Sequence, residues 1–527
     1  MRPDVKNPSK MTRSHSVRAH GDAAVLCDED RELISCSPVL TSREVIDEGL
    51  CVEAGTLGER LGRSKTQVVE LTERGRAMVE KIHVRCGKLF QGTEEKVLEN
   101  HTIVAEDGIV TRVAPTKDVP KLADAREYDF ARYFVIPGLI DVHTHLAYGN
   151  AKTEEDIDLY SSLEFRAVRG VFFAHQVLAS GFTTIVAPGD SGMVSRAIRD
   201  AIDAGLFEGP RVTAAGPYIT SRQGLTDWYP TWIGVPTTSI GRLVRNRDEA
   251  IEEIRKQVKE GVDAVKIAMD GIHRRPNGEL VAAFTLDETK AMVEEIRRLG
   301  KISIVHARGR EATLYAAKTG VDLIFHASEI DDEGLEAAVA NKCAICPTLT
   351  LLRNTMDFIE PQDPAFRERR NSVYNAEFDA AVENLKKVRR AGVPMPIGTD
   401  SGFAVTPFGE WHARELEIFV DHLGFTPIQA LKAATSVSAR VVRPNDKVGA
   451  LMPGYQADFV ALDGDPTKSV SILLDRSKVA SVFKGGAPIG PGRRKYDPRR
   501  VSDFAMTISS DLYTRERVAE LGYRKAS

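Results

Sequence analysis

Short apolar runs alternate with amphipathic stretches from about residue 138 to residue 443. One amphipathic stretch, Leu286–Leu299, follows Thr285 and carries Glu288 in its first turn, a spacing typical of a helix capping box. Eight apolar runs separated by helices predict an α/β protein, a (β/α)8 barrel of the TIM type, with its chemistry at the carboxyl ends of the strands. The runs are Leu139–His143, Thr183–Ala187, Arg211–Ala215, Asp263–Ile267, Ile302–His306, Asp322–His326, Cys343–Thr348 and Met395–Gly398.

The two flanks of this region have shorter, strand-like patterns. Alternating residues on either side of Asp107-Gly108 indicate a hairpin. The simplest arrangement pairs residues 81–137 with 444–495 in a small β-sandwich domain, next to a barrel of residues 138–443.

The two ends of the chain are polar. Residues 1–80 are expected to be an N-terminal extension, disordered in part, and 496–527 a C-terminal tail. An amphipathic stretch at 57–71 fits a solvated helix or a loosely ordered extension better than a helix-turn-helix.

Composition narrows the function classes. The 527 residues carry a net charge of −4, too balanced to favour nucleic-acid binding. The chain has no run of about 18 apolar residues, so we expect no membrane span. The N-terminus also lacks the apolar stretch of a secretory signal, so we expect a cytoplasmic protein. Six cysteines in so long a chain do not indicate a disulfide scaffold, and Cys343-Ala-Ile-Cys346 lies in an apolar run typical of a buried strand.

Two histidines at the end of the first apolar run carry the strongest chemical signal. His143 and His145 are two residues apart. Because residues i and i+2 of a strand point to the same face, their imidazoles converge. Two converging imidazoles form half of a divalent metal site, for which zinc is the default ion.

Polar side chains also stand on other strands or at their ends. Lys266 lies among apolar residues, His306 and His326 end the fifth and sixth runs, and Asp400 follows the eighth. Taken singly, each histidine fits a satisfied core residue, the lysine a charge paired with a carboxylate, and the aspartate a helix cap. Their joint placement at one mouth of a barrel favours a catalytic metal centre.

These motifs together resemble the amidohydrolase superfamily over roughly residues 80–490. Their spacing is most similar to the branch that holds Xaa-Pro dipeptidases, ochratoxinase and molinate hydrolase. The matching segments are Pro137–His145, Val265–Ile267, Ile304–His306, Phe325–His326, Gly398–Ser401 and Gly449–Val460.

The resemblance implies two divalent metal ions, most readily zinc, with cobalt or manganese as alternatives. By similarity, His143, His145 and Asp400 hold the more buried ion. His306 and His326 hold the other.

The resemblance further implies that Lys266, carboxylated by CO₂, bridges the two ions. A desolvated lysine beside cations loses its proton readily, which makes the carbamate chemically reasonable. A metal-bridging hydroxide would attack a carbonyl, with Asp400 as general base and then general acid. The implied reaction is hydrolysis of an amide, carbamate or related C–N bond in a small molecule.

Specificity is expected to come from the loops after the strands. The loop at 216–232 offers Tyr218, Arg222 and Trp228 as substrate contacts, although its aromatic residues are equally expected to pack against the loop itself. His273 lies just beyond the fourth strand and is a weaker candidate, since a surface histidine is the commoner case. This loop lacks the Gly-Gly-His element of related dipeptidases, which disfavours a dipeptide substrate.

Other functions remain open at this point. The main alternative is a metallopeptidase that cleaves an Xaa-Pro or C-terminal residue. A deaminase fits less well, because related deaminases usually bind one metal and lack the strand-4 lysine. A non-enzymatic barrel is disfavoured by the intact set of candidate ligands. We expect a homo-oligomer with a small-molecule substrate.

Overall fold

The computed structural model describes residues 80–122, 124–358, 364–490, 492, 496, 497, 501, 509 and 511–522. The amphipathic stretch at 57–71 lies outside these residues. Val79–Ser527 forms one compact unit, and the fold is described within it.

Parallel strands form the wall of the barrel, confirming the predicted architecture. They belong to two sheets, one ordered β5-β6-β7 and the other β15-β14-β13-β10-β8-β9. Seven of the eight predicted runs form strands, which are β5 (Leu139–Asp141), β6 (Phe182–Ala187), β7 (Arg211–Ala214), β10 (Ala264–Ala268), β13 (Ile302–Ala307), β14 (Leu323–His326) and β15 (Ala344–Cys346).

Backbone hydrogen bonds close these two sheets into a ring. Asp263 N donates to the carbonyl of Ala214 (2.8 Å), which joins β10 to β7. The eighth predicted run, Met395–Gly398, completes the ring together with Pro394. The Pro394 carbonyl accepts a hydrogen bond from Ile345 N on β15, and the Ile397 carbonyl accepts one from Val142 N after β5, each 2.9 Å long. This run is not a regular strand, because Pro394 and Pro396 have no N–H to donate.

The segment after β7 differs from the single loop expected at 216–232. It contains β8 (Tyr218–Thr220), which pairs in parallel with β9 (Gly241–Leu243) and contacts β10. A separate hairpin, β11 (Asp270–Arg274) and β12 (Leu280–Ala282), follows β10.

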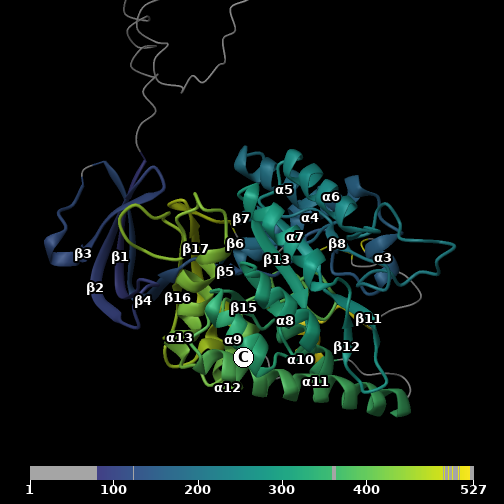
Figure 1. The fold of residues 1–527 in the computed structure, drawn as a ribbon. Helices are drawn as coiled ribbons and strands as arrows, with labels where there is room; N and C mark the ends of the chain where they lie inside the picture. The colour runs from purple at the N-terminus through teal and green to yellow at the C-terminus, as the bar shows by residue number, and fades with distance from the viewer. Residues whose placement is uncertain are drawn as a thin grey trace, which may run out of the picture. The chain divides into compact units, whose positions relative to one another are not determined.

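Helices connect the strands, and α11 is the long helix along the lower edge of the view in Figure 1. The capping box predicted at Thr285 and Glu288 begins α7. No helix among the described residues is both long and apolar enough to cross a membrane. The helices are α3 (Glu154–Asp158), α4 (Leu163–Ala179), α5 (Val194–Asp203), α6 (Arg247–Lys259), α7 (Leu286–Arg298), α8 (Arg310–Thr319), α9 (Asp332–Ala340), α10 (Thr350–Phe358), α11 (Pro364–Arg390), α12 (Arg414–Asp421), α13 (Pro427–Lys432) and α14 (Arg515–Glu520).

The segments that flank the barrel in the sequence meet in a separate sheet, so the predicted small β domain draws strands from both flanks. Its seven strands form one continuous sheet ordered β18-β17-β16-β4-β1-β2-β3. Asp107 and Gly108, with φ of 48° and 79°, form the predicted hairpin turn. The strands are β1 (Lys81–Phe90), β2 (Val97–Glu106), β3 (Ile109–Pro115), β4 (Ala125–Pro137), β16 (Phe459–Leu462), β17 (Val479–Lys484) and β18 (Ala487–Pro488).

This sheet leads directly into the barrel. β4 pairs with β16, and Gly138 alone separates β4 from β5. A side chain at Gly138 would lie 2.1 Å from Oγ1 of Thr183, so only glycine fits here. The close approach holds the start of β5 against β6, and β5 carries the chain into His143 and His145.

Candidate active site

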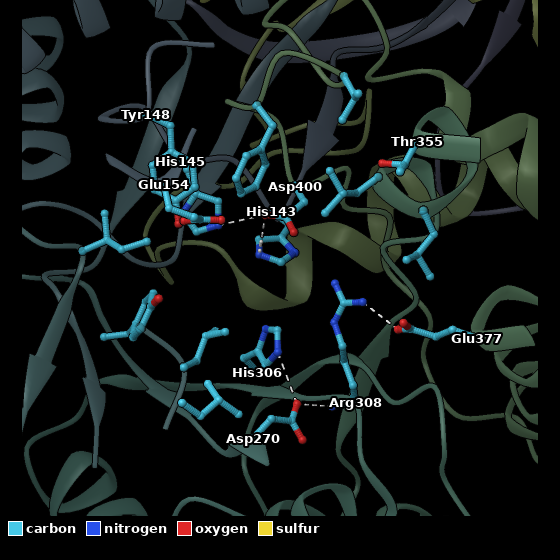
Figure 2. Close-up of a pocket in the computed structure, with 18 of the residues that line it drawn as sticks. His143, His145, Tyr148, Glu154, Asp270, His306, Arg308, Thr355, Glu377 and Asp400 are labelled. Atoms are coloured by element: carbon cyan, nitrogen blue, oxygen red, sulfur yellow. Dashed lines mark hydrogen bonds and ion pairs between the residues drawn. The ribbon is translucent and has the colours of Figure 1, made fainter. Parts of the chain in front are cut away.

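His143 and His145 meet Asp400 at the mouth of the barrel (Figure 2). Oδ1 of Asp400 lies 3.4 Å from Nε2 of His143 and 3.0 Å from Nε2 of His145. The two histidines are buried, as is Asp400. The expected convergence of the first and eighth strands is therefore present in the structure.

Outer hydrogen bonds fix which nitrogen of each ring faces this cluster. Nδ1 of His145 is 2.8 Å from the carbonyl of Gly189, and Nδ1 of His143 is 3.1 Å from Oγ1 of Thr348. Because the carbonyl can only accept, His145 carries its proton on Nδ1 and presents the Nε2 lone pair. Metal-binding histidines are commonly oriented in this way.

His306 and His326 come from the ends of β13 and β14, and their ring centres are 4.6 Å apart. Nε2 of His306 faces Oδ2 of Asp270 at 3.2 Å, which leaves Nδ1 as its remaining donor atom. Nε2 of His326 is buried and has no hydrogen-bond partner among the residues that the structure describes. A buried polar atom without a partner is costly, unless a ligand satisfies it.

Lys266, on β10, points into the same cluster. Its Nζ lies 3.4 Å from Nε2 of His143 and 4.4 Å from the ring centre of Phe325. Burial lowers the pKa of Lys266 from 10.5 to about 7. Near neutral pH a large fraction of this amine is therefore unprotonated, the form that can react with CO₂.

Electrostatics keep the nitrogen donors neutral and the carboxylate charged. Burial lowers the pKa of His143 and of His326 well below the usual value, and that of His306 to a lesser degree. Burial also opposes ionisation of Asp400, but its contact with His145 and the nearby Lys266 and Arg308 outweigh burial, and the pKa of Asp400 is lowered. Neutral imidazoles and an ionised carboxylate are the forms that bind metal.

The donor set fits divalent ions. One ligand atom each from His143, His326 and Asp400 lies within 4.8 Å of the others. His326 and Asp400 have φ values of 72° and 57°, a backbone conformation that side chains other than glycine seldom adopt. Such strain concentrates at functional sites. The unpartnered nitrogen of His326 and the mixed nitrogen and oxygen donors fit zinc, cobalt or manganese.

Asp141 ties the first strand to the eighth. Its Oδ1 accepts hydrogen bonds from the backbone N–H groups of His143 (2.9 Å) and Thr399 (3.2 Å). Its Oδ2 accepts from Oγ1 of Thr399 (2.5 Å) and lies 2.7 Å from Nδ1 of His412. Because Nε2 of His412 accepts from Gly409 N, the ring proton lies on Nδ1 and is donated to Asp141. This network fixes the backbone on which two candidate ligands stand.

A cavity of about 550 Å³ opens above the cluster. Tyr218 and Trp228, two of the predicted substrate contacts, line it. Arg222 and His273 are exposed and are not among the lining residues. The structure thus brings two of the four predicted contacts to the cavity.

Several lining residues were not identified from the sequence. They are Tyr148, Glu154, Asp270, Arg308 and Glu377. Arg308 had a detectable signal, because it stands two residues beyond His306 and so shares its face of the strand. Glu377 had none, since it comes from α11, far along the chain.

The C-terminal tail also reaches the site. Ser509 lines the cavity. Tyr513 N donates to the carbonyl of Ala404 (3.1 Å), and Nε1 of Trp411 donates to the carbonyl of Tyr513 (2.6 Å). These bonds fasten the tail to the segment that follows Asp400.

Comparison with known proteins gives relatives of the same architecture. The chain is 26% identical over 485 residues to an ochratoxinase from Aspergillus niger, a match that covers 88% of this chain and 97% of the relative. A crystal structure of a Xaa-Pro dipeptidase with bound methionine in the active site aligns with a TM-score of 0.68 and 26% identity, over 78% of this chain and 99% of that one. Molinate hydrolase, with a TM-score of 0.65 and 22% identity over 78% and 95% of the two chains, shows the shared fold.

These relatives include all three enzymes of the branch that the motif spacing indicated. The family model of the amidohydrolases matches residues 134–489, well over half of the chain, and this span includes every candidate metal ligand. The chain belongs to the amidohydrolase family.

Proposed function

We propose that this protein is a metal-dependent hydrolase with two divalent ions that cleaves an amide, carbamate or related C–N bond in a small molecule. The observation that carries the proposal is the meeting of four buried histidines and Lys266 around Asp400, with no hydrogen-bond partner for Nε2 of His326 among the described residues. A protein core does not gather such groups without a ligand to satisfy them.

The ligand assignment is the one that membership in the amidohydrolase family implies. His143, His145 and Asp400 would hold one ion, and His306 and His326 the other. When bound, two divalent ions would acidify a water molecule and polarise a carbonyl oxygen.

Lys266 and Asp400 have the further roles in this proposal. Lys266, as its carbamate, would supply two oxygen ligands, and its depressed pKa makes the free amine available for carboxylation. Asp400 is ionised and next to His145, so it can accept the proton released when water attacks the carbonyl. It can then deliver that proton to the departing nitrogen.

A Xaa-Pro dipeptidase is the second candidate. The dipeptidase alignment at 26% identity over nearly all of that protein favours it. The departure of the loop at 216–232 from the dipeptidase pattern argues for the non-peptide substrate instead. The two candidates share the metal centre and differ only in what the cavity accepts.

A substrate panel on metal-loaded protein tests the proposal. The chain would be depleted of metal, reloaded with zinc, cobalt or manganese in bicarbonate, and assayed on N-acyl amino acids, Xaa-Pro dipeptides, anilides, carbamates and phenylureas. We expect metal-dependent hydrolysis of at least one class. Hydrolysis confined to Xaa-Pro dipeptides would select the second candidate, and no hydrolysis by protein that holds two ions would contradict both.

A further inference from the structure

A partly buried arginine stands beside the histidine cluster without a role in the chemistry above. Arg308 follows His306 by two residues, and its side chain rises into the cavity below Asp400 and His143 (Figure 2). Its backbone N–H donates to Oδ2 of Asp270 at 2.5 Å, and that same oxygen lies 3.2 Å from His306. Asp270 therefore fixes the arginine and the histidine relative to each other.

The guanidinium is only partly satisfied by the protein. Nη1 donates to Oε1 of Glu377 at 2.6 Å. Within the described part of the chain we find no other hydrogen bond from this side chain, although a guanidinium has five N–H donors. Burial lowers the pKa of Arg308, but Glu377 and Asp400 outweigh this effect and the pKa is raised, so the positive charge persists.

The other residues that line the cavity indicate which substrate groups could bind to the Arg308 charge. Aromatic and aliphatic side chains form much of the wall, including Tyr218, Leu351 and Phe403. Glu154 lines the cavity beside His145 and Tyr148, and has no ion-pair partner among the residues described. An anionic group on the substrate is thus attracted to the side of the site where Arg308 stands. Burial raises the pKa of Glu154 to about 7, so this carboxyl is only partly ionised near neutral pH.

We propose that Arg308 binds a carboxylate of the substrate, so that the preferred substrates are amides of amino acids with a free carboxylate, such as N-acyl amino acids. The fork of N–H donors on arginine matches the two oxygens of a carboxylate. This inference rests on the proposed hydrolase function and narrows it, because neutral carbamates, anilides and phenylureas offer no such group.

A purely structural explanation has to be separated from this one. The Arg308–Glu377 pair also fastens α11 to the barrel, since Glu377 lies on that helix. Loss of the arginine could then reduce activity by moving α11. That effect would act equally on all substrates, whereas loss of carboxylate binding acts only on those with a carboxylate.

The test compares two matched compounds, N-acetylphenylalanine and N-acetylphenethylamine, which differ by the carboxylate alone. In the metal-loaded wild type we expect kcat/KM to be about 30- to 100-fold higher for the acid, the range expected of a charge-assisted pair. In Arg308→Met this ratio should fall towards one, mainly through KM. Arg308→Lys should restore part of it, and Arg222→Met, at an exposed arginine outside the cavity, should leave it unchanged.

One further variant and the outcomes that would contradict the inference complete the test. Glu377→Gln removes the ion pair but keeps the arginine, and should preserve the preference for the acid. A wild-type ratio near one, or a ratio that Arg308→Met leaves intact, would overturn the inference while the hydrolase function stands. Hydrolysis of other panel amides but of neither compound would overturn it in the same way, whereas no hydrolysis of any amide by the metal-loaded enzyme would remove the proposed function as well.

Discussion

A buried histidine serves as a metal ligand only if the correct ring nitrogen faces inward. In this protein the orientation comes from outer partners: Gly189 holds Nδ1 of His145, and Asp270 faces Nε2 of His306. The two rings therefore offer different nitrogens, Nε2 from His145 and Nδ1 from His306. Burial keeps His306 neutral by lowering its pKa. These contacts explain how a mostly apolar barrel can hold nitrogen donors ready for a cation.

Replacement of Asp400 tests its role in proton transfer. Asp400→Asn keeps the size of the side chain but removes the base, so we expect kcat to fall by about 10²- to 10⁴-fold, the usual contribution of a positioned acid–base group. Circular dichroism and thermal unfolding should show a retained fold. Asp248→Asn, at a side chain that is 93% exposed, is the matched control. Similar losses in both variants would rule out a specific role for Asp400.

The depressed pKa of Lys266 makes carboxylation depend on pH. The neutral amine reacts with CO₂, and with a pKa of about 7 its fraction rises as the pH rises through 7. In ¹³C-bicarbonate buffer we therefore expect a strong carbamate ¹³C resonance at pH 8 and a weak one at pH 6. Uptake of added metal ions in this buffer should show the same pH dependence. An ordinary lysine, with a pKa of about 10.4, would give little carbamate at either pH. A resonance that survives in Lys266→Met would show that another group is carboxylated.

The strands of the barrel bring the candidate ligands together, and the positions of these strands could be predicted in part from the sequence. The ends of β5, β10, β13 and β14 could be predicted because apolar runs mark the strands and chemistry gathers at their carboxyl ends. The eighth segment of the barrel wall, which leads to Asp400, was predicted too, although Pro394 and Pro396 prevent a regular strand there. What the pattern could not supply was β8, since a strand of three residues inside a long connection has too little periodicity to detect.

The residues that line the cavity could also be predicted only in part from the sequence. Arg222 was expected to meet the substrate, but the structure exposes it and places Arg308 in the cavity instead. Local spacing could have indicated Arg308, because His306 precedes it on the same face. The partnership with Glu377 depends on how α11 packs, which no local pattern encodes.

Asp141 joins the first strand to the eighth and offers a test at the level of elements. Its two oxygens accept hydrogen bonds from His143, Thr399 and His412. Asp141→Asn keeps the shape but replaces one acceptor oxygen with a donor, so we expect a loss of about 2–4 kcal/mol in stability and weaker metal retention. Thermal unfolding of the metal-free protein measures the first effect and metal titration the second. Unchanged stability would mean that the strands are held together by other contacts.

The whole molecule is one compact unit from Val79 onward, in which the flanking sheet, the barrel and the tail all contribute. Ser509 lines the cavity, and Tyr513 is buried against the segment after Asp400. No function for this polar tail could be predicted from the sequence, because its contacts are with loops rather than with a periodic face. The expected homo-oligomer stays a prediction, which light scattering of the purified protein would measure.

Removal of the N-terminal extension tests whether this unit is sufficient. Every candidate ligand and every described core residue lies beyond residue 79. We expect a chain that begins at Val79 to keep the metal content, unfolding temperature and kcat/KM of the full-length protein. A loss of activity with the fold intact would show that residues 1–78 contribute to the site.

The metal content of the purified protein tests the central claim most directly. Elemental analysis of the full-length chain, purified in bicarbonate without chelators, should find close to two divalent ions per chain. His326→Ala should reduce this number towards one, because the residue that it replaces carries the unpartnered buried nitrogen. A well-folded wild-type protein that binds no divalent ion, even after incubation with zinc, cobalt or manganese, would contradict the account.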